Sequence, residues 1–392
     1  MGPLPRPRVR LKWAAPGGAV IAIGAVLAGT MLASAAAPDL PRQTPAKLLA
    51  AMAHAKLPRA MSATLSESAN LGFPALPDIG GAPASPLSPA SLISGTHTIQ
   101  IWCAGPRQVR IALPVSFGET DLRVNGSQVW LWDSSKQTAT HILPPAASHY
   151  MLAGPAGHAR PGDAPAAPTP PTPLQAARRL LALVGPTTRV TVAGTTVVAG
   201  RDAYQLTIAP RTSRSLVGRI LIAVDARTHL PLSVAVYARG ASSPAFRIGF
   251  TSLSFARPAA SNFAFTPPPG AHVKTVRLPA PGLGMMPGVH VGWSGSPPVS
   301  RGPGPLAGGR TFGTGWLAVA SFPVGPALAS AGGRGPGLLG LLLKAAKPVH
   351  GPWGTGRLLR TSLVSVLITS KGQLLAGAVT PAVLYADAAK VS

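Results

Sequence analysis

Apolar side chains recur at every second position through most of the stretch from Gly95 to Ile142. A period of two is the mark of β-strands with one buried face, so the stretch predicts a meander of about five consecutive strands. The residues that share the apolar face are Ile99, Ile101, Cys103, Val109, Ile111, Leu113, Leu122, Val124, Val129 and Leu131. Asn125-Gly126 separates two of these runs, and both residues accept the positive φ angles of a type I′ hairpin turn. In that register, Leu122 faces Val129 and Thr120 faces Leu131.

Large aromatic residues lie on the opposite face of the same meander. Trp102, Trp130 and Trp132 alternate with the apolar set and fall among Glu119 and Asp121. The sheet therefore has apolar material on both faces, for which there are two explanations. Either a helix or loop covers the second face, or a curved sheet encloses a ligand cavity, as small barrels do.

Helices are predicted before and after the meander. Thr44 and Pro45 are typical of an N-cap and a first helical position, and an Ala/Leu-rich run follows as far as Lys56. Pro173 to Val184 is predicted to be a second helix, and the alternation from Arg59 to Ala69 predicts a first strand.

A second series of strands follows. Its members are Arg189 to Val198, Ala203 to Ile208, Arg219 to Val224, Leu232 to Tyr237 and Phe246 to Phe255. In the last of them the apolar positions change phase near Ser252, which predicts a β-bulge. About ten antiparallel strands with one or two helices make an α+β arrangement.

The later part of the chain predicts a linker and a separate module. Gly and Pro number 44 and 45, and they dominate residues 274–309, which we interpret as a linker. Residues 310–392 predict a small α+β module. Its expected elements are strands from Gly315 to Phe322, Leu358 to Ile368 and Gln373 to Val379, and helices from Leu338 to Ala346 and from Pro381 onward.

The N-terminal residues 1–38 predict export. Basic residues from Arg6 to Lys12 precede an uncharged, largely apolar run from Trp13 to Pro38. This is typical of a signal peptide or a membrane anchor, since about 20 residues span a bilayer. Ala33-Ser34-Ala35 offers a cleavage site, but the length of the run favours retention. We therefore expect a protein of the cell membrane with its bulk outside the cytoplasm, or a secreted protein if the run is cleaved.

The chain has a net charge of +25, and so large a positive charge often indicates a polyanionic partner. Here the basic residues are scattered and accompany no aromatic recognition motif, so we expect no nucleic-acid binding. Glu119 and Asp121 are the one pair of acids close enough in sequence to act together, and a solvated strand face explains them better than catalysis. The histidines lack metal-ligand spacing and Cys103 is the single cysteine. We therefore expect no catalytic residues, no metal, no cofactor and no enzyme activity.

Several short sequence motifs resemble those of a known family. They are Ser94-Gly95-Thr96-His97-Thr98, Asn125-Gly126 with Val129-Trp130, Val198-Ala199-Gly200-Arg201-Asp202-Ala203-Tyr204 and Asn262-Phe263-Ala264-Phe265-Thr266-Pro267-Pro268. The chain resembles the LolA-like superfamily of lipoprotein carriers, which is similar to the sensor domain of sigma-E regulators, and in particular its actinobacterial extracytoplasmic members. The resemblance covers about Pro45 to Val273. It implies a half-open antiparallel β-barrel over residues 39–273, with helices at its mouth and an inner surface that shelters acyl chains.

The expected function is therefore binding or carriage of a lipid or lipoprotein. The expected lipid-binding residues are Ile99, Ile101, Ile111, Leu122, Leu131, Ile220, Ile222, Leu232, Val234, Phe246 and Ile248. The alternative is a membrane-anchored sensory or scaffold protein that regulates an envelope-stress or sporulation process by binding a protein partner, whose identity the sequence does not give.

Overall fold

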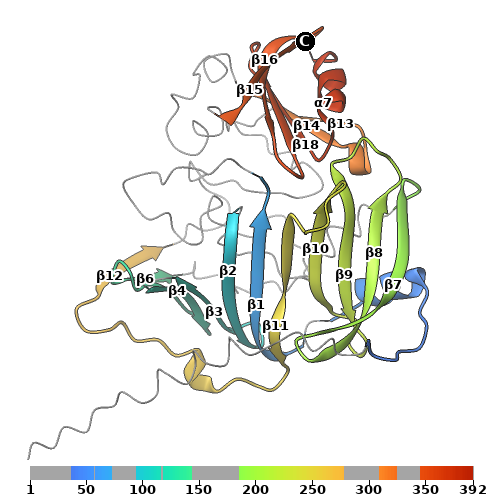
Figure 1. Cartoon of the computed structure of the whole chain (residues 1–392). Coiled ribbons are helices and arrows are strands. Elements are labelled where there is room, and N and C mark those ends of the chain that lie inside the picture. Colours follow the sequence, from blue (N-terminus) through green and yellow to red (C-terminus); the bar gives the residue numbers. More distant parts are fainter. Residues whose placement is uncertain are drawn as a thin grey trace, which may run out of the picture. The chain divides into compact units, whose positions relative to one another are not determined.

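The computed structural model describes residues 37–56, 58–72, 94–115, 118–143, 185–277, 309–324 and 345–391. Residues 38–392 form one compact unit that holds a large sheet of twelve strands and a smaller sheet of six (Figure 1). The predicted N-terminal segment, the second helix and most of the predicted linker lie outside the described residues.

The large sheet follows the predicted meander and the predicted second series of strands. Its strands are β1 (Ala60–Asn70), β2 (Ser94–Ala104), β3 (Gln108–Val115), β4 (Gly118–Asn125), β5 (Gln128–Asp133), β6 (Thr138–Leu143), β7 (Thr188–Val198), β8 (Arg201–Pro210), β9 (Val217–Asp225), β10 (Pro231–Ala238), β11 (Phe246–Ser254) and β12 (His272–Arg277). Helix α2 (Pro45–Ala53) precedes them, and a 3₁₀ turn η1 (Ala260–Asn262) lies between β11 and β12.

The predicted half-open barrel is an open sheet. The strand order is β12-β6-β5-β4-β3-β2-β1-β11-β10-β9-β8-β7, so β12 and β7 are the two edge strands within the described part of the chain. The expectation of an antiparallel sheet holds for every pair except β12 with β6, which is parallel. Strand β12 includes residues 274–277, where we expected the linker to begin. Its pairing with β6 connects segments far apart in the chain, and no local alternation of apolar residues predicts this strand.

Local signals predicted the start of α2 and the bulge in β11. The Thr44 hydroxyl accepts a hydrogen bond from the backbone N–H of Lys47, as an N-cap does. The pairing of β1 with β11 shifts register between Thr64 and Leu65, whose partners are Ser252 and Phe250, so Thr251 is the extra residue. The bulge lies where the apolar set changes phase.

The predicted register of the β4–β5 hairpin is wrong by two residues. Leu122 pairs with Leu131 rather than Val129, and Asn125 pairs with Gln128. The turn therefore centres on Gly126 and Ser127. Gly126 has φ +65°, and a positive φ at the first central residue is the glycine position of a type II′ turn. A shift of two residues leaves every side chain on its predicted face.

The smaller sheet belongs to the predicted C-terminal module. It contains β13 (Arg310–Phe312), β14 (Val319–Pro323), β15 (Lys347–Gly351), β16 (Gly354–Arg360), β17 (Ser365–Thr369) and β18 (Gln373–Gly377), and the module also includes η2 (Gly315–Leu317) and α7 (Pro381–Ala388). The module is richer in strands than expected. Most of the predicted helix from Leu338 to Ala346 lies outside the described residues.

The single strand predicted from Leu358 to Ile368 is in fact two strands. Thr361 interrupts it, because its hydroxyl accepts from the backbone N–H of Val364 and donates to the Val364 carbonyl, which closes a turn. The turn presents Leu363, which is buried in the same cluster as Ile220 and Ile248 of the large sheet.

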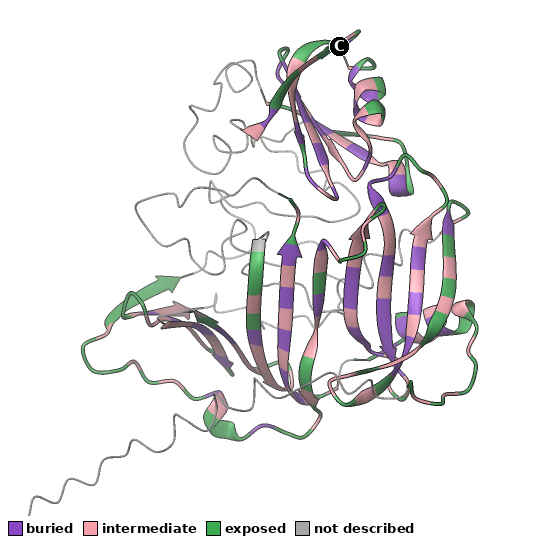
Figure 2. Cartoon of the chain, viewed as in Figure 1, coloured by how far each residue is buried: buried purple, intermediate pink, exposed green. Residues whose placement is uncertain are grey.

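Buried and partly exposed residues alternate along β1 and β8, as expected for strands with one covered face (Figure 2). The main core cluster lies on one face of the large sheet, and Trp316 of η2 packs into it. A second cluster, around Trp353, Leu367 and Leu384, belongs to the smaller sheet and α7.

Candidate functional site

The candidate site is the face of the large sheet that carries the main core cluster, here called the inner face. Its residues line up in rows across the strands because cross-strand partners share a face. One such row contains Ala63, Ile101, Ile111, Leu122 and Leu131. The inner face therefore continues from β1 to β5 without a change of side.

The structure brings together all but one of the predicted lipid-binding residues on this face. Those on the inner face are Ile99, Ile101, Ile111, Leu122, Leu131, Ile220, Ile222, Val234, Phe246 and Ile248. Leu232 lies elsewhere, in a separate cluster with Ala203 and Ala223. The pairing of β10 with β9 shifts register between Pro231 and Ser233, so the strict alternation that we assumed for Leu232 and Val234 fails there.

The inner face divides into a covered part and a partly exposed part. On β8 to β11 it is mostly covered, since Ile222 and Ile248 have no solvent exposure and only its margin, at Val236 and Phe246, is partly exposed. On β2 to β5 it is more open, because Ile101, Ile111 and Leu131 are only partly buried. Apolar surface in excess of what the described elements cover therefore lies on the meander half of the sheet.

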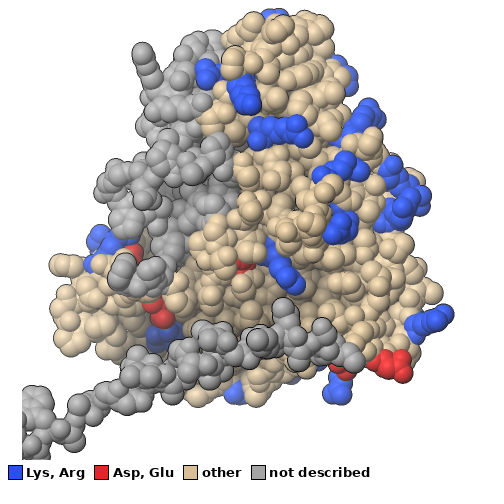
Figure 3. All heavy atoms as spheres, in the orientation of Figure 1, with Lys and Arg blue, Asp and Glu red and all other residues tan. Residues whose placement is uncertain are grey.

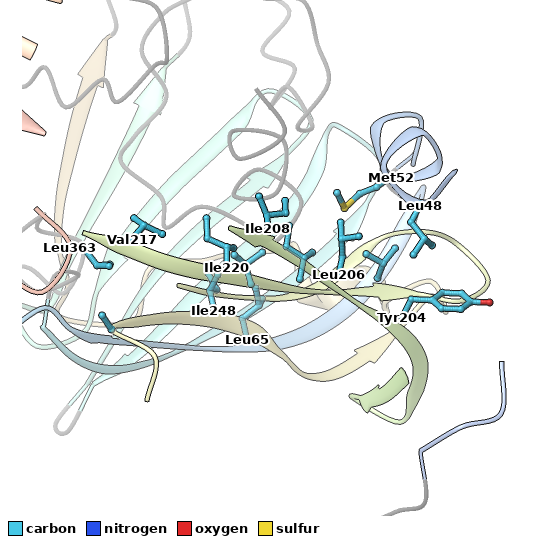
Figure 4. Close-up of a cluster of buried hydrophobic side chains, with 14 of the residues drawn as sticks. Leu48, Met52, Leu65, Tyr204, Leu206, Ile208, Val217, Ile220, Ile248 and Leu363 are labelled. Atoms are coloured by element: carbon cyan, nitrogen blue, oxygen red, sulfur yellow. The ribbon is translucent and has the colours of Figure 1, made fainter. Parts of the chain in front are cut away.

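Helix α2 covers the other half. Its Leu48 and Met52 are 1% and 0% exposed, and they pack in the main core cluster with Leu206 and Ile208. Figure 4 shows both side chains pointing from the helix toward β8. Nine residues make a short helix, which gains its stability mainly from this packing.

The outer face of the meander carries the aromatic residues noted in the sequence. Trp130 stacks on His141 with ring centroids 4.2 Å apart, and Phe265 lies 5.5 Å from Trp130 and 6.0 Å from Trp132. The segment that contains Phe265 thus covers this face. Of the two explanations for the tryptophans, coverage by a loop is the one that the structure supports.

The acidic pair of the same face is held by arginines. Asp121 has no exposure and lies 3.0 Å from Arg110 and 2.7 Å from Arg123, and Glu119 lies 3.0 Å from Arg110. Arg110 also lies over the ring of Trp102, with its guanidinium carbon 4.7 Å from the centroid. Asp121 is thus the buried centre of an ion network, rather than part of the solvated strand face that we expected, while Glu119 stays partly exposed.

Glu67 is the polar residue of the inner face that sequence reasoning missed. It is 2% exposed, pairs across the strands with His97 and Ile248, and its carboxylate oxygens have no hydrogen-bond partner in the described part of the chain. Burial raises the pKa of this carboxyl from 4.5 to about 7, and the nearby charge of His97 opposes the shift. Its burial could have been predicted from the alternation along β1, because position 67 falls on the same face of the strand as Met61 and Leu65.

Basic residues are scattered over the visible face of the molecule and acidic ones are few, in agreement with the composition (Figure 3). Among the described residues, no three His, Cys, Asp or Glu side chains are grouped so that they hold a metal ion. The helices in the described ranges are all too short or too polar to cross a membrane. Cys103 lies on the inner face but is partly exposed rather than buried.

A search of solved structures matches, among others, three that are described here. The MucA/MucB complex of Pseudomonas aeruginosa is 16% identical with a TM-score of 0.36, and the match covers 87% of this chain and 94% of the other. LprF from Mycobacterium bovis is 10% identical with a TM-score of 0.26, over 58% of this chain and 95% of the other. A LolA superfamily protein from Nitrosomonas europaea is 12% identical with a TM-score of 0.21, over 57% and 99%.

All three TM-scores lie below 0.5 and all three identities are 16% or less, so these likenesses assign neither a role nor a partner to this chain. No family model matches the chain, and no curated protein matches its sequence. That the chain is an actinobacterial member stays a prediction.

Proposed function

We propose that this protein is an extracytoplasmic carrier that binds the acyl chains of a lipid or lipoprotein on the inner face of its large sheet, without catalysis. The observation that carries the proposal is the partly exposed apolar row of Ile101, Ile111, Leu122 and Leu131. It joins the buried core without a break, so a ligand on this row would extend an apolar surface that already exists.

The hydrophobic effect alone supplies useful affinity for such a ligand. Each methylene that moves from water onto an apolar surface gains about 0.8 kcal/mol, so about ten carbons gain on the order of 8 kcal/mol before ordering costs. This free energy of binding for one acyl chain requires no polar contact. Selection of a head group would then depend on polar residues at the border of the apolar surface.

The wider organisation is part of the same proposal. Residues 1–38 would carry the chain across the membrane and retain it there, with the basic residues from Arg6 to Lys12 inside. The large sheet, expected over residues 39–273 and extended by β12 to Arg277, would form the binding domain and residues 310–392 an accessory module, with the linker between them beginning after β12.

A second candidate function is a sensory or scaffold protein that binds a protein partner. The observation that favours it is the edge strand β12, whose six residues are all exposed and which, among the described strands, pairs with β6 alone. An exposed edge offers backbone groups to an extended peptide, which adds as a further strand. Val273 and Val276 supply apolar contacts there, since they are 55% and 40% exposed.

Native mass spectrometry of the purified protein, together with lipid extraction, tests the two candidates. The carrier proposal expects an adduct of lipid mass that is lost on delipidation and regained when lipid is added back. A protein that carries no lipid, regains none and binds no acyl probe would contradict the carrier proposal and leave the protein-binding candidate.

A further inference from the structure

The apolar row of the meander ends at a basic residue on the edge strand β12. Beyond Leu131 the row continues to Thr140 on β6, and the cross-strand partner of Thr140 is Lys274 on β12. Figure 1 shows β12 beside β6, at the end of the meander. Because cross-strand partners share a face, the Lys274 side chain belongs to the inner face, on the same row as Ile101.

The row becomes polar in one direction only. Its members from Ile101 to Leu131 are aliphatic, then Thr140 adds a hydroxyl and Lys274 an ammonium group. Neighbouring strands lie about 4.8 Å apart, so the aliphatic part from β2 to β5 is about 14 Å long and Lys274 lies about 10 Å farther on. A lipid tail spans half of a bilayer's hydrocarbon core, about 15 Å, so one acyl chain matches the aliphatic part.

The row is accessible along this whole length. Its aliphatic members on β2 to β5 are partly exposed, as is Thr140, and Lys274 is exposed. It differs in this respect from the covered part of the inner face, where Ile222 and Ile248 have no exposure. A ligand would therefore lie on an open surface and would not have to displace side chains of the core.

The charge of Lys274 is not matched within the described part of the chain. All ion pairs there involve other residues. The next row of the inner face contains His272 and Asp133, and Lys136 already pairs with Asp133 at 2.8 Å. An anionic group at the end of the row would thus meet the ammonium group of Lys274 and the hydroxyl of Thr140.

We propose that this row binds one fatty acid, with its acyl chain on the aliphatic residues and its carboxylate at Lys274 and Thr140. The inference rests on the proposed acyl-binding function and adds the class of ligand and the residues that hold its head group. One row matches one chain, and one ammonium group matches the single charge of a carboxylate. The two carboxylate oxygens accept hydrogen bonds from the ammonium group and the hydroxyl. A phosphomonoester carries more charge than this one ammonium group neutralises.

The test compares three ligands of equal chain length, namely palmitate, the uncharged monoacylglycerol monopalmitin, and hexadecyl phosphate. Each displaces a fluorescent acyl probe from the full-length protein at about pH 8, where a fatty acid is ionised and histidines are neutral. The proteins are the wild type, Lys274→Gln, Lys274→Glu and Arg277→Gln. The last is the matched control, because it removes a positive charge from the other face of the same exposed strand.

Lys274→Gln should weaken palmitate binding about fivefold, since an exposed ion pair contributes up to about 1 kcal/mol. Lys274→Glu should weaken it by about tenfold or more, because it places a like charge at the carboxylate. Monopalmitin should bind both variants as it binds the wild type, which also shows that they fold. Added salt should weaken palmitate binding to the wild type and have little effect in Lys274→Gln.

The other outcomes separate the head-group inference from the carrier proposal. Palmitate binding that is unchanged in both Lys274 variants, or that falls equally in Arg277→Gln, overturns the role of Lys274 and leaves the carrier proposal standing. Tighter binding of hexadecyl phosphate than of palmitate, lost in Lys274→Gln, overturns the choice of a carboxylate. A wild type that binds none of the ligands nor the probe overturns the carrier proposal itself.

Discussion

Nε of Arg110 on β3 lies 3.1 Å from both carboxylate oxygens of Asp121 on β4, and the Asp121 side chain has no solvent exposure. Arg123 donates to the same carboxylate at 2.7 Å. A buried charge is tolerated when it is paired and hydrogen-bonded. Here two guanidinium groups donate hydrogen bonds to the buried carboxylate of Asp121. The network ties adjacent strands together on the face opposite the candidate site.

Asp121→Asn should lower the free energy of unfolding by about 3–5 kcal/mol, because it leaves two poorly solvated guanidinium groups without their shared anion. Asp133→Asn is the matched control, since its partner Lys136 is 54% exposed and an exposed pair contributes less than about 1 kcal/mol. Urea unfolding followed by circular dichroism measures both. Equal, small losses in the two variants would contradict the importance of the buried network.

The buried Glu67 predicts a pH dependence of stability. Its pKa is raised from 4.5 to about 7, so between these values the folded protein holds a proton that the unfolded chain has released. The free energy of unfolding should therefore fall as the pH rises through this window and stay at the lower level above it. The full effect of this one group is at most about 3 kcal/mol.

Glu67→Gln should remove this contribution and make the protein more stable than the wild type above about pH 7. The quantity to compare is the difference between variant and wild type in urea unfolding at several pH values, because other groups titrate in both. Ser66→Ala changes no ionisable group and should follow the wild type. If the wild type and Glu67→Gln show parallel pH profiles, Glu67 does not hold its proton in the folded state.

Much of the inner face was predictable because it depends on alternation alone. Ile99, Ile111 and Ile222 follow a period of two, and a strand keeps that period whatever its partners are. The bulge in β11 was predictable for the same reason, since a change of phase is visible in a single strand. Even the wrong hairpin register left the faces correct, because Leu122 moved by two positions.

The remainder depends on contacts that no local pattern encodes. Leu232 changes face at a register shift that involves the partner strand β9. Strand β12 exists because it pairs with β6, and its own sequence shows no alternation of apolar residues. The alternation along β1 places Glu67 at a buried position, but a charged residue is normally expected at the surface. Its burial therefore became apparent only from the structure.

Trp316 connects the C-terminal module to the large sheet. Its indole Nε1 donates to the hydroxyl of Thr188 at 2.8 Å, and its ring packs in the main core cluster. Trp316→Phe should cost about 1 kcal/mol for the lost hydrogen bond, and Trp316→Ala about 3–5 kcal/mol because of the cavity. Both changes should increase hydrogen exchange in β7 and β9, in addition to the module.

Trp353→Phe is the control for that prediction. Trp353 is also buried, but it packs in the cluster of the smaller sheet, beside Tyr385. Its replacement should increase exchange within residues 310–392 and leave β7 and β9 protected. If Trp316→Ala affects only residues 310–392, then the module is not energetically coupled to the large sheet.

The last prediction concerns the acyl surface itself. Leu122 and Leu131 are direct cross-strand partners on the inner face, and both are partly exposed. Replacing both with Asp places two like charges opposite each other on this surface, and a lipid tail would have to desolvate them. Uptake of a fluorescent fatty-acyl probe should fall by about tenfold or more.

Loss of binding counts only if the variant folds, so circular dichroism and the unfolding midpoint must accompany it. Ser127→Asp provides the matched control, because it adds a charge at the exposed turn of the same hairpin without touching the inner face. It should bind the probe as the wild type does. If a folded double variant still takes up the probe with unchanged affinity, acyl chains do not bind along this row. In that case, the partly exposed apolar surface is better explained by a protein partner, and the exposed edge of β12 is the place to look for it.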